Sequence, residues 1–244
     1  MKAVDKDLTA RHNQDQRAYF EGSDQRTLKP TGTLYLRRHT EVMSEFANIK
    51  PGDRVLELGC GLGRYTLLLA EAGVAVEGLD LSPQLLKQLR EHNAGRYDIP
   101  THGFDIIDAP KELYGTFDAV IGFFVLHHVH DLEACLTVAT KLVKPGGRVA
   151  FLEPNPMNPL YYLQITFTPE MRWKAERGML KMTPKDMFPL MEKAGLTGVE
   201  VKRFGLFPPQ VTNLKYGAKI ETKLDPLAPW HGFHPFALFG GARA

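Results

Sequence analysis

The segment from Glu57 to Gly63 carries the clearest chemical signal in this sequence. It reads Glu-Leu-Gly-Cys-Gly-Leu-Gly, with glycines at Gly59, Gly61 and Gly63. Glycine lets a backbone turn sharply and lie close to a ligand. The helix expected after the turn presents free backbone N–H groups, and an anionic group can rest against them. The sequence therefore predicts a ligand-binding turn at this point.

The spacing of the glycines and the acid before them argue against a dinucleotide. A dinucleotide-binding turn has the pattern GxGxxG, whose third glycine would stand where this chain has Arg64. Glu57 would repel a pyrophosphate, but it would attract an ammonium group. S-adenosylmethionine has an ammonium, a carboxylate and a cationic sulfonium, and it has no phosphate. We therefore expect S-adenosylmethionine as the cofactor, and a nicotinamide dehydrogenase is the least favoured interpretation.

Two further carboxylates follow at positions that suit the rest of this cofactor. Asp80 stands nineteen positions beyond Gly61, where a carboxylate can accept hydrogen bonds from both ribose hydroxyls. Leu81 is expected to pack on the adenine ring, and Asp105 to accept a hydrogen bond from its amino group. The alternative for Asp80 is a turn aspartate that only caps the following helix.

These residues fall at the ends of strands in a chain that alternates strand and helix. Strands are predicted over 54–58, 76–80, 101–105, 118–123 and 148–153, with helices over 33–47, 65–72 and 132–143 and from Pro83 after a Ser82 cap. Beyond a proline-rich stretch, we predict partly helical structure over 160–182, a helix over 183–195, a strand over 199–206, a helix over 211–224 and a strand over 236–240. Such alternation predicts a parallel, doubly wound sheet with its ligand at the carboxyl ends of the strands.

Five motifs stand in order between Val55 and Pro154: ELGCGLG, VEGLDLS, HGFDIIDAP, FDAVIGFFVLHHV and LVKPGGRVAFLEP. Together they resemble the class I S-adenosylmethionine-dependent methyltransferases, and in particular the small-molecule group of ubiquinone-biosynthesis and natural-product enzymes. The resemblance implies an α/β fold with a Rossmann-like, seven-stranded, mostly parallel sheet, helices on both faces and a small helical cover. The chain is then one methyltransferase domain over 1–244, with a helical lid (1–50), a cofactor-binding core (51–154) and a substrate-side cover that completes the sheet (155–244).

The resemblance also implies which residues contact the cofactor. The predicted set is Glu57, Gly59, Cys60, Gly61, Asp80, Leu81, Asp105, Ile106 and Phe123, together with Tyr19 from the lid. Cys60 is included because it lies in the turn, where a small side chain is required, and packing is its main expected role. Phe123 stands where relatives often have a small or polar residue, and the third motif is looser than the common GDAxxLP.

The histidines of the fourth motif are the predicted catalytic residues. Histidine suits a general base because its ordinary pKa is close to neutral, and related enzymes place a histidine of the LHH segment beside the acceptor. We predict His127 or His128 in this role, with His127 placed first; the alternative is that both pack the loop and bond to backbone. No metal is predicted, because adjacent histidines are expected to point in different directions and no second ligand cluster is visible.

Composition limits the partners of the protein. Thirty basic and twenty-eight acidic residues give a net charge of +2, so nothing favours nucleic acid as a partner. No apolar run reaches the roughly 20 residues that would span a bilayer. The two cysteines have no metal-site or disulfide spacing, and the N-terminus has no apolar signal core, so we expect a cytoplasmic protein.

The predicted reaction is methyl transfer to a moderately hydrophobic small molecule, with an oxygen acceptor favoured and nitrogen or carbon acceptors possible. The alternatives are an RNA or protein methyltransferase, and a cofactor-binding protein that catalyses a step other than methylation. Aromatic and methionine residues after the fifth strand are expected to line the acceptor pocket or the core: Tyr161, Tyr162, Phe167, Met171 and Trp173. The aromatic tail around Trp230, His231, Phe233 and His234 is expected to close the pocket or to form a contact in a homodimer.

Overall fold

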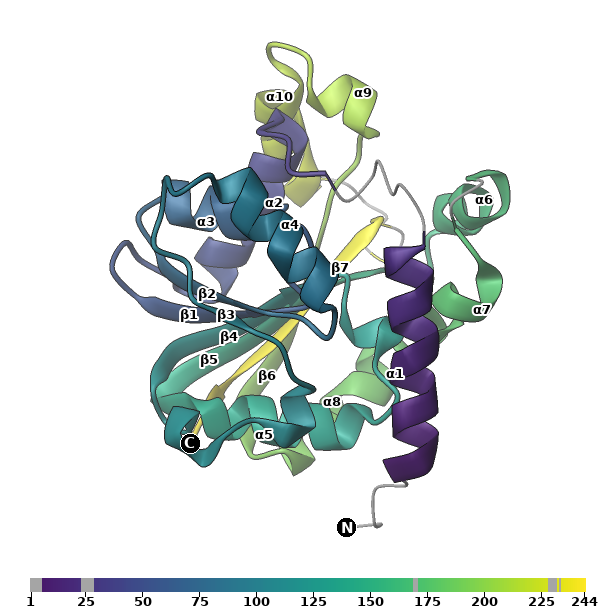
Figure 1. Ribbon diagram of the computed structural model, residues 1–244. Helices are drawn as coiled ribbons and strands as arrows, with labels where there is room; N and C mark the ends of the chain where they lie inside the picture. Colours follow the sequence, from purple (N-terminus) through teal and green to yellow (C-terminus); the bar gives the residue numbers. More distant parts are fainter. Residues whose placement is uncertain (1–5, 23–28, 169–170, 228–231, 233) are drawn as a thin grey trace.

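The computed structural model describes residues 6–22, 29–168, 171–227, 232 and 234–244 (Figure 1). Its strands are β1 (Arg54–Leu58), β2 (Ala75–Leu79), β3 (Thr101–His102), β4 (Phe117–Phe123), β5 (Val143–Pro154), β6 (Leu196–Phe204) and β7 (Phe236–Arg243). Its α-helices are α1 (Lys6–Glu21), α2 (Leu34–Phe46), α3 (Thr66–Glu71), α4 (Pro83–Asn93), α5 (Leu132–Leu142), α6 (Pro159–Phe167), α7 (Trp173–Glu176), α8 (Pro184–Lys193), α9 (Pro209–Thr212) and α10 (Gly217–Leu224). Short 3-10 turns are η2 (Ile106–Asp108), η3 (Lys111–Leu113), η4 (Leu126–His128), η5 (Arg177–Lys181) and η6 (Asp225–Leu227).

The strands form one seven-stranded sheet in the order β3-β2-β1-β4-β5-β7-β6. Pairing is parallel from β3 through β5, whereas β7 runs antiparallel to both β5 and β6. The predicted Rossmann-like, mostly parallel sheet is therefore confirmed. Strand order reverses between β1 and β4, so the loops after these two strands border the crevice in which ligands of such sheets bind.

Helices cover both faces of the sheet because neighbouring strand residues point to opposite sides. Leu56 and Leu58 of β1 belong to a core with α5 and α8, whereas Val55 belongs to a second core with α2 and α3. In Figure 1, α5 and α8 lie on one side of the sheet and α2 and α3 on the other. The result is a three-layer arrangement that holds the ends of β1, β2 and β4 rigidly.

Several predicted elements differ in extent from those observed. Strand β3 has only two residues, because Asp105 turns the chain into η2, accepting a hydrogen bond from the Ile107 amide at 3.1 Å. The helix predicted over 211–224 is divided into α9 and α10, and the 160–182 region into α6, α7 and η5. Helix α4 begins as predicted: the Ser82 hydroxyl accepts a hydrogen bond from the Leu85 amide, and Pro83 follows.

Helix α1 stands apart from the three layers and passes along the carboxyl edge of the sheet (Figure 1). The Asn13 amide donates to Asp105 (2.5 Å), and a His12 ring nitrogen lies 2.7 Å from the carbonyl oxygen of His128. The Tyr19 hydroxyl donates to Glu176 at 3.3 Å. These polar contacts attach α1 over the end of the crevice, where a lid would lie.

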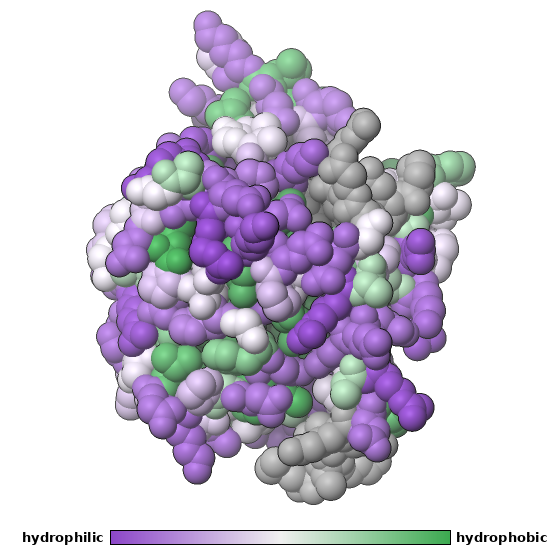
Figure 2. Space-filling model, viewed as in Figure 1, coloured by the Kyte–Doolittle hydropathy of each residue, from purple (hydrophilic) through white to green (hydrophobic). Residues whose placement is uncertain are grey.

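The surface in the same view is mostly hydrophilic, with scattered apolar atoms (Figure 2). None of the described helices combines the length and the apolar character that crossing a bilayer requires. Large apolar side chains are nevertheless exposed on α6 and around α10, where Phe167 and Leu227 are 78% and 74% exposed.

Candidate active site

A cavity of about 820 Å³ opens at the carboxyl ends of the strands, within the range of small-molecule sites. Its walls come from α1, from the turn after β1, from the ends of β2 and β4, and from α6 and the 205–209 loop. Every site residue that the sequence predicts lines it: Tyr19, Glu57, Gly59, Cys60, Gly61, Asp80, Leu81, Asp105, Ile106, Phe123, His127 and His128. Segments distant in sequence are thus brought to one chamber.

The glycine turn has the conformation that its sequence predicts. Gly59, Gly61 and Gly63 all have positive φ, at 65°, 51° and 84°, a region that other residues rarely adopt. A Cβ on Gly59 would lie 2.5 Å from the nearest methyl carbon of Val125, so no larger residue fits. Cys60 is buried, and its sulfur lies against Gly78, where a Cβ would be 2.7 Å away. The turn is therefore set by close backbone approach.

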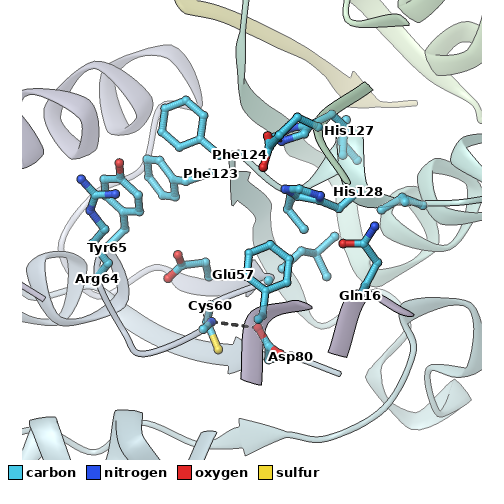
Figure 3. A pocket seen from close by; sticks show the side chains of 18 of the residues that line it. Gln16, Glu57, Cys60, Arg64, Tyr65, Asp80, Phe123, Phe124, His127 and His128 are labelled. Carbon is cyan, nitrogen blue, oxygen red and sulfur yellow. Dashed lines mark hydrogen bonds and ion pairs between the residues drawn. The ribbon is translucent and has the colours of Figure 1, made fainter. Parts of the chain in front are cut away.

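Glu57 is a buried carboxyl at the floor of the cavity (Figure 3). It accepts a hydrogen bond from the Thr66 hydroxyl at 2.6 Å. Burial raises the pKa of Glu57 to about 8, and the nearby Asp80 carboxylate adds to the rise. At neutral pH the group is therefore largely protonated, and a cationic ligand beside it would favour the ionised form.

Asp80 is held at the end of β2 by two backbone amides. Gly61 N–H donates to one carboxylate oxygen and Ser82 N–H to the other, each at 2.9 Å. Burial raises the pKa of Asp80, and these two hydrogen bonds oppose that rise. The cap of α4 is Ser82 itself, so the alternative of Asp80 as a plain helix cap does not describe the geometry. The carboxylate instead ties the glycine turn to β2 and faces the cavity.

Asp105 has partners on both of its oxygens. One oxygen accepts from the Ile107 amide within η2, and the other accepts from Asn13 of α1. Ile106 beside it is buried and belongs to the wall of the cavity. A ligand that bonds to Asp105 must therefore share that carboxylate with α1.

His127 lies between two buried carboxylates. Its Nδ1 is 2.5 Å from Glu153 and its Nε2 is 3.3 Å from Glu176, and its side chain is 1% exposed. Although burial opposes charge on this ring, the two carboxylates raise the pKa of His127 to about 9. The other oxygen of Glu153 accepts from the amides of Val125 and Leu126 at 3.0 and 2.7 Å. Both ring nitrogens are thus occupied, a geometry that does not suit His127 as the base placed first by the sequence.

The two adjacent histidines converge, and the prediction that they point in different directions is wrong. They lie on the 3-10 turn η4, their ring centres are 4.0 Å apart, and both rings lie near Glu176. One ligand atom each from His127, His128 and Glu176 lies within 4.8 Å of the others, a spacing that could hold a metal ion. A proton shared by His127 and Glu176 fits the same place, and the raised pKa of His127 favours it.

His128 differs from its neighbour in both charge and bonding. Its Nδ1 is buried and has no hydrogen-bond partner among the residues that the structure describes. Burial and the neighbouring His127 lower the pKa of His128 to about 3, so the ring is neutral at physiological pH. In Figure 3 the ring projects from the His127 side toward Glu57 across the chamber. A neutral imidazole with an unused nitrogen can accept a proton from a bound group.

The paired His127 gives a testable dependence of stability on pH. Its folded pKa, about 9, exceeds the ordinary histidine value of 6.5, so its stabilisation is complete below pH 6.5 and is lost as pH rises through 9. We expect the free energy of unfolding, measured in urea, to fall over this interval by on the order of 3 kcal/mol. A His127→Gln variant should lack this contribution and keep only the fall up to about pH 8 that the raised pKa of Glu57 causes; equal slopes in both proteins would contradict the assignment.

Arg64 and Tyr65 are among the cavity residues that the sequence did not predict as site residues. The Arg64 Nε and the Tyr65 hydroxyl are buried with no hydrogen-bond partner among the described residues. The Tyr65 ring stacks on Phe123 with 4.1 Å between ring centres, and both residues lie on the same side of the chamber as Glu57 (Figure 3). Arg64 occupies the position where a dinucleotide turn has its third glycine. This difference from the dinucleotide pattern is the sequence signal that could have identified Arg64 as a site residue.

The aromatic residues after β5 divide between the cavity and the surface. Tyr161 and Met171 line the cavity, and the Tyr161 hydroxyl donates to Glu176 at 3.1 Å. Phe167 and Trp173 are exposed instead. His234 is buried and lines the cavity, whereas the predictions for Trp230, His231 and Phe233 lie outside the described residues.

The sheet order and the acid-flanked glycine turn at its switch point define a Rossmann-like, cofactor-binding α/β domain. A model of the methyltransferase domain family matches residues 26–201. The chain therefore belongs to this methyltransferase family, as its motifs indicate.

The curated relatives are methyltransferases, and solved structures of low sequence identity share the fold but differ in chemistry. Over 98 residues the chain is 37% identical to a ubiquinone biosynthesis O-methyltransferase of Xanthomonas campestris, covering 40% of this chain and 41% of that protein. The chain thus spans about two fifths of the curated relatives it matches. A Haemonchus contortus phosphoethanolamine N-methyltransferase 2, solved with S-adenosylhomocysteine, has a TM-score of 0.58 at 17% identity, covering 84% of this chain and 52% of that one. A (4+2)-cyclase has a TM-score of 0.58 at 16% identity, covering 85% and 81%.

Proposed function

We propose that this protein transfers a methyl group from S-adenosylmethionine to a hydroxyl of a small, moderately hydrophobic molecule. The observation that carries the proposal is a single chamber with a buried acid and a glycine turn at one end and a neutral histidine at the other. Family membership supports methyl transfer, and the O-methyltransferase relatives favour an oxygen acceptor. We retain three further predictions as proposals: one domain over 1–244, a cytoplasmic location and a possible homodimer.

The polar groups on the cavity wall fit an adenosyl amino acid. Glu57 is suited to hold the ammonium, and the buried Arg64 Nε, which lacks a partner among the described residues, is suited to bind the carboxylate. Asp80, fixed by two amides, would accept from the ribose hydroxyls, with Leu81 against the adenine and Asp105 at its amino group. When bound, S-adenosylmethionine supplies an electrophilic methyl group on a cationic sulfur. The chain's own contribution is alignment and exclusion of water.

His128 is the residue that we assign as general base for an oxygen acceptor. Its buried Nδ1 would take the proton of an acceptor hydroxyl bound in the chamber. His127 is a positioning residue, because its ring is fixed by Glu153 and Glu176 and packs against His128. Tyr161, Met171 and Phe20 give the acceptor side of the chamber an apolar character.

Cofactor binding is expected to release a proton from Glu57. Its carboxyl has a pKa of about 8 in the free protein, so most molecules must deprotonate it at pH 7 before it can pair with an ammonium group. Affinity for S-adenosylhomocysteine should therefore rise between pH 6 and pH 8. Calorimetric heats at pH 7 should also depend on the ionisation enthalpy of the buffer.

Two variants test this proton release. Glu57→Gln should bind more weakly and should not show the Glu57 contribution to proton uptake or release. Glu112→Gln, which removes an exposed carboxylate of η3, should behave as the unmodified protein. An unchanged proton count in Glu57→Gln would exclude Glu57 as the titrating group.

A product assay with a panel of phenols, catechols and amines tests the proposed reaction itself. Mass spectrometry should detect S-adenosylhomocysteine and one methylated product in equal amounts, with hydroxyl acceptors preferred. Tight cofactor binding with conversion of an acceptor but no S-adenosylhomocysteine would instead indicate a non-methylating reaction. Activity confined to RNA or protein substrates would favour the macromolecular alternative.

A further inference from the structure

The helix α10 and the residues just before it carry two parallel stripes on their exposed side. Tyr216, Ile220 and Leu224 are spaced four apart and are 58%, 49% and 40% exposed. Lys215, Lys219 and Lys223 precede them by one position each and are exposed as well. Residues four apart lie on one face of a helix, so an apolar stripe runs beside a basic one.

At the surface, the positive charge of these lysines is not offset by acidic side chains of the same segment. Glu221 and Asp225 are the acidic residues of 213–227, and both are buried. They pair with Arg38 of α2, and Glu221 is 3.3 Å from its Nε. The exposed charge of this segment is therefore entirely positive.

A second apolar face stands on α6. Residues 154–168 contain no charged side chain, and Leu160, Leu163 and Phe167 are 65%, 52% and 78% exposed. In Figure 1, α9 and α10 form the top of the molecule and α6 its upper right. Figure 2 shows hydrophobic and strongly hydrophilic atoms side by side over the α9–α10 region. We call the exposed stripes of α10 and this face of α6 the rim.

The α6 face of the rim lines the active-site cavity, and α10 is bonded to a loop that lines it. Leu160 and Gln164 of α6 line that cavity, as do Leu206 and Phe207 of the loop before α9. The amides of Leu206 and Phe207 both donate to Glu221 of α10, at 2.7 and 2.8 Å. A surface that covers the α6 face of the rim therefore lies next to the cavity.

We infer that the rim rests on an anionic lipid bilayer, from which a hydrophobic acceptor enters the cavity. Exposed apolar side chains beside lysines, with no exposed acid on the same segment, match a lipid surface with negative head groups. A second copy of the chain fits less well, because a symmetric contact would bring the lysine stripes of both copies together. The entry of an acceptor from the bilayer rests on the proposed function, whereas the binding of the rim to the bilayer does not depend on it.

Sedimentation with lipid vesicles tests the inference. The full chain should bind vesicles of equal parts phosphatidylcholine and phosphatidylglycerol, and bind phosphatidylcholine alone much more weakly. Added salt should reduce binding to the anionic vesicles. The double change Lys219→Gln with Lys223→Gln should weaken that binding about thirtyfold, since each lysine near such a surface contributes about fivefold. Ile220→Ser with Leu224→Ser, and Leu163→Ser with Phe167→Ser, should weaken it as well.

The matched control removes two exposed lysines away from the rim, Lys111→Gln with Lys185→Gln, and should bind vesicles nearly as the unmodified chain does. Thermal melting and S-adenosylhomocysteine affinity verify that each variant folds. The inference would be overturned if the unmodified chain did not bind vesicles. It would also be overturned if the control variant lost as much vesicle binding as the rim variants. Concentration-dependent dimerisation that the rim changes abolish would overturn it in favour of a second copy. Methyl transfer to soluble acceptors can persist in either case, so the two proposals fail separately.

Discussion

Replacing His128 with glutamine is expected to lower the turnover of a hydroxyl acceptor by about 100-fold to 10,000-fold, the contribution typical of a positioned general base. The reasons for this expectation are the neutral ring of His128 and its Nδ1, which has no hydrogen-bond partner in the described part of the chain. S-adenosylhomocysteine affinity should stay within a few fold, because His128 stands across the chamber from Glu57 and Asp80 (Figure 3). Steady-state kinetics with calorimetry separates the two effects.

The dependence on pH distinguishes a base from a packing residue. As pH approaches the pKa of a phenolic acceptor, the acceptor ionises in solution and the defect of His128→Gln should shrink. His92→Gln on α4, a histidine outside the cavity lining, provides the matched control and should retain activity. A defect of constant size at every pH, or a matching loss of cofactor affinity, would assign His128 a structural role.

Replacing Asp80 with alanine is expected to weaken S-adenosylmethionine binding about 100-fold or more. The change would remove the charged oxygens that we expect to accept from the two ribose hydroxyls, at a cost of about 3 kcal/mol or more. The amides of Gly61 and Ser82 would also lose their hydrogen-bond partner. The glycine turn would then be less well fixed to β2. Calorimetry with the cofactor measures the change directly.

Two companion changes sharpen this measurement. Asp80→Asn keeps an acceptor for one amide and should lose less affinity than Asp80→Ala. Asp108→Ala removes an exposed acid close to Asp105 but outside the cavity lining, and it should bind as the unmodified chain does. Undiminished binding by Asp80→Ala would remove Asp80 from the site.

The cofactor half of the chamber was predictable because its signals are local. Glycines at 59, 61 and 63 need positive φ, and Asp80 ends a strand that its own apolar residues define. The Ser82 cap and Pro83 mark the start of α4 within three residues of Asp80. The short-range sequence pattern was therefore sufficient to predict that Glu57 and Asp80 lie at one crevice.

The acceptor half depends on partners that are distant in sequence. Glu153 approaches His127 across 26 positions, and Glu176 reaches it from α7, a helix of four residues with no distinctive pattern. Asn13 meets Asp105 across 92 positions. The charge state of each histidine depends on these contacts. The motif alone therefore could not show which of His127 and His128 is the better candidate for the general base.

The position of the two histidine rings has a similar origin. Neighbouring side chains of a strand or a helix point apart, yet the rings of His127 and His128 have centres 4.0 Å apart, and both lie near Glu176, which is distant in sequence. The exposure of α6 was equally hidden, since its aromatic sequence is typical of a buried helix, yet within α6 only Ile165 is buried.

Calorimetric titration of the unmodified chain with S-adenosylhomocysteine, and separately with NAD, measures directly which kind of molecule the chamber holds. We expect saturable one-to-one binding of S-adenosylhomocysteine that S-adenosylmethionine displaces, and no saturable heat from NAD. Saturable NAD binding with no heat from either adenosyl amino acid would contradict the assignment of Glu57 and Asp80.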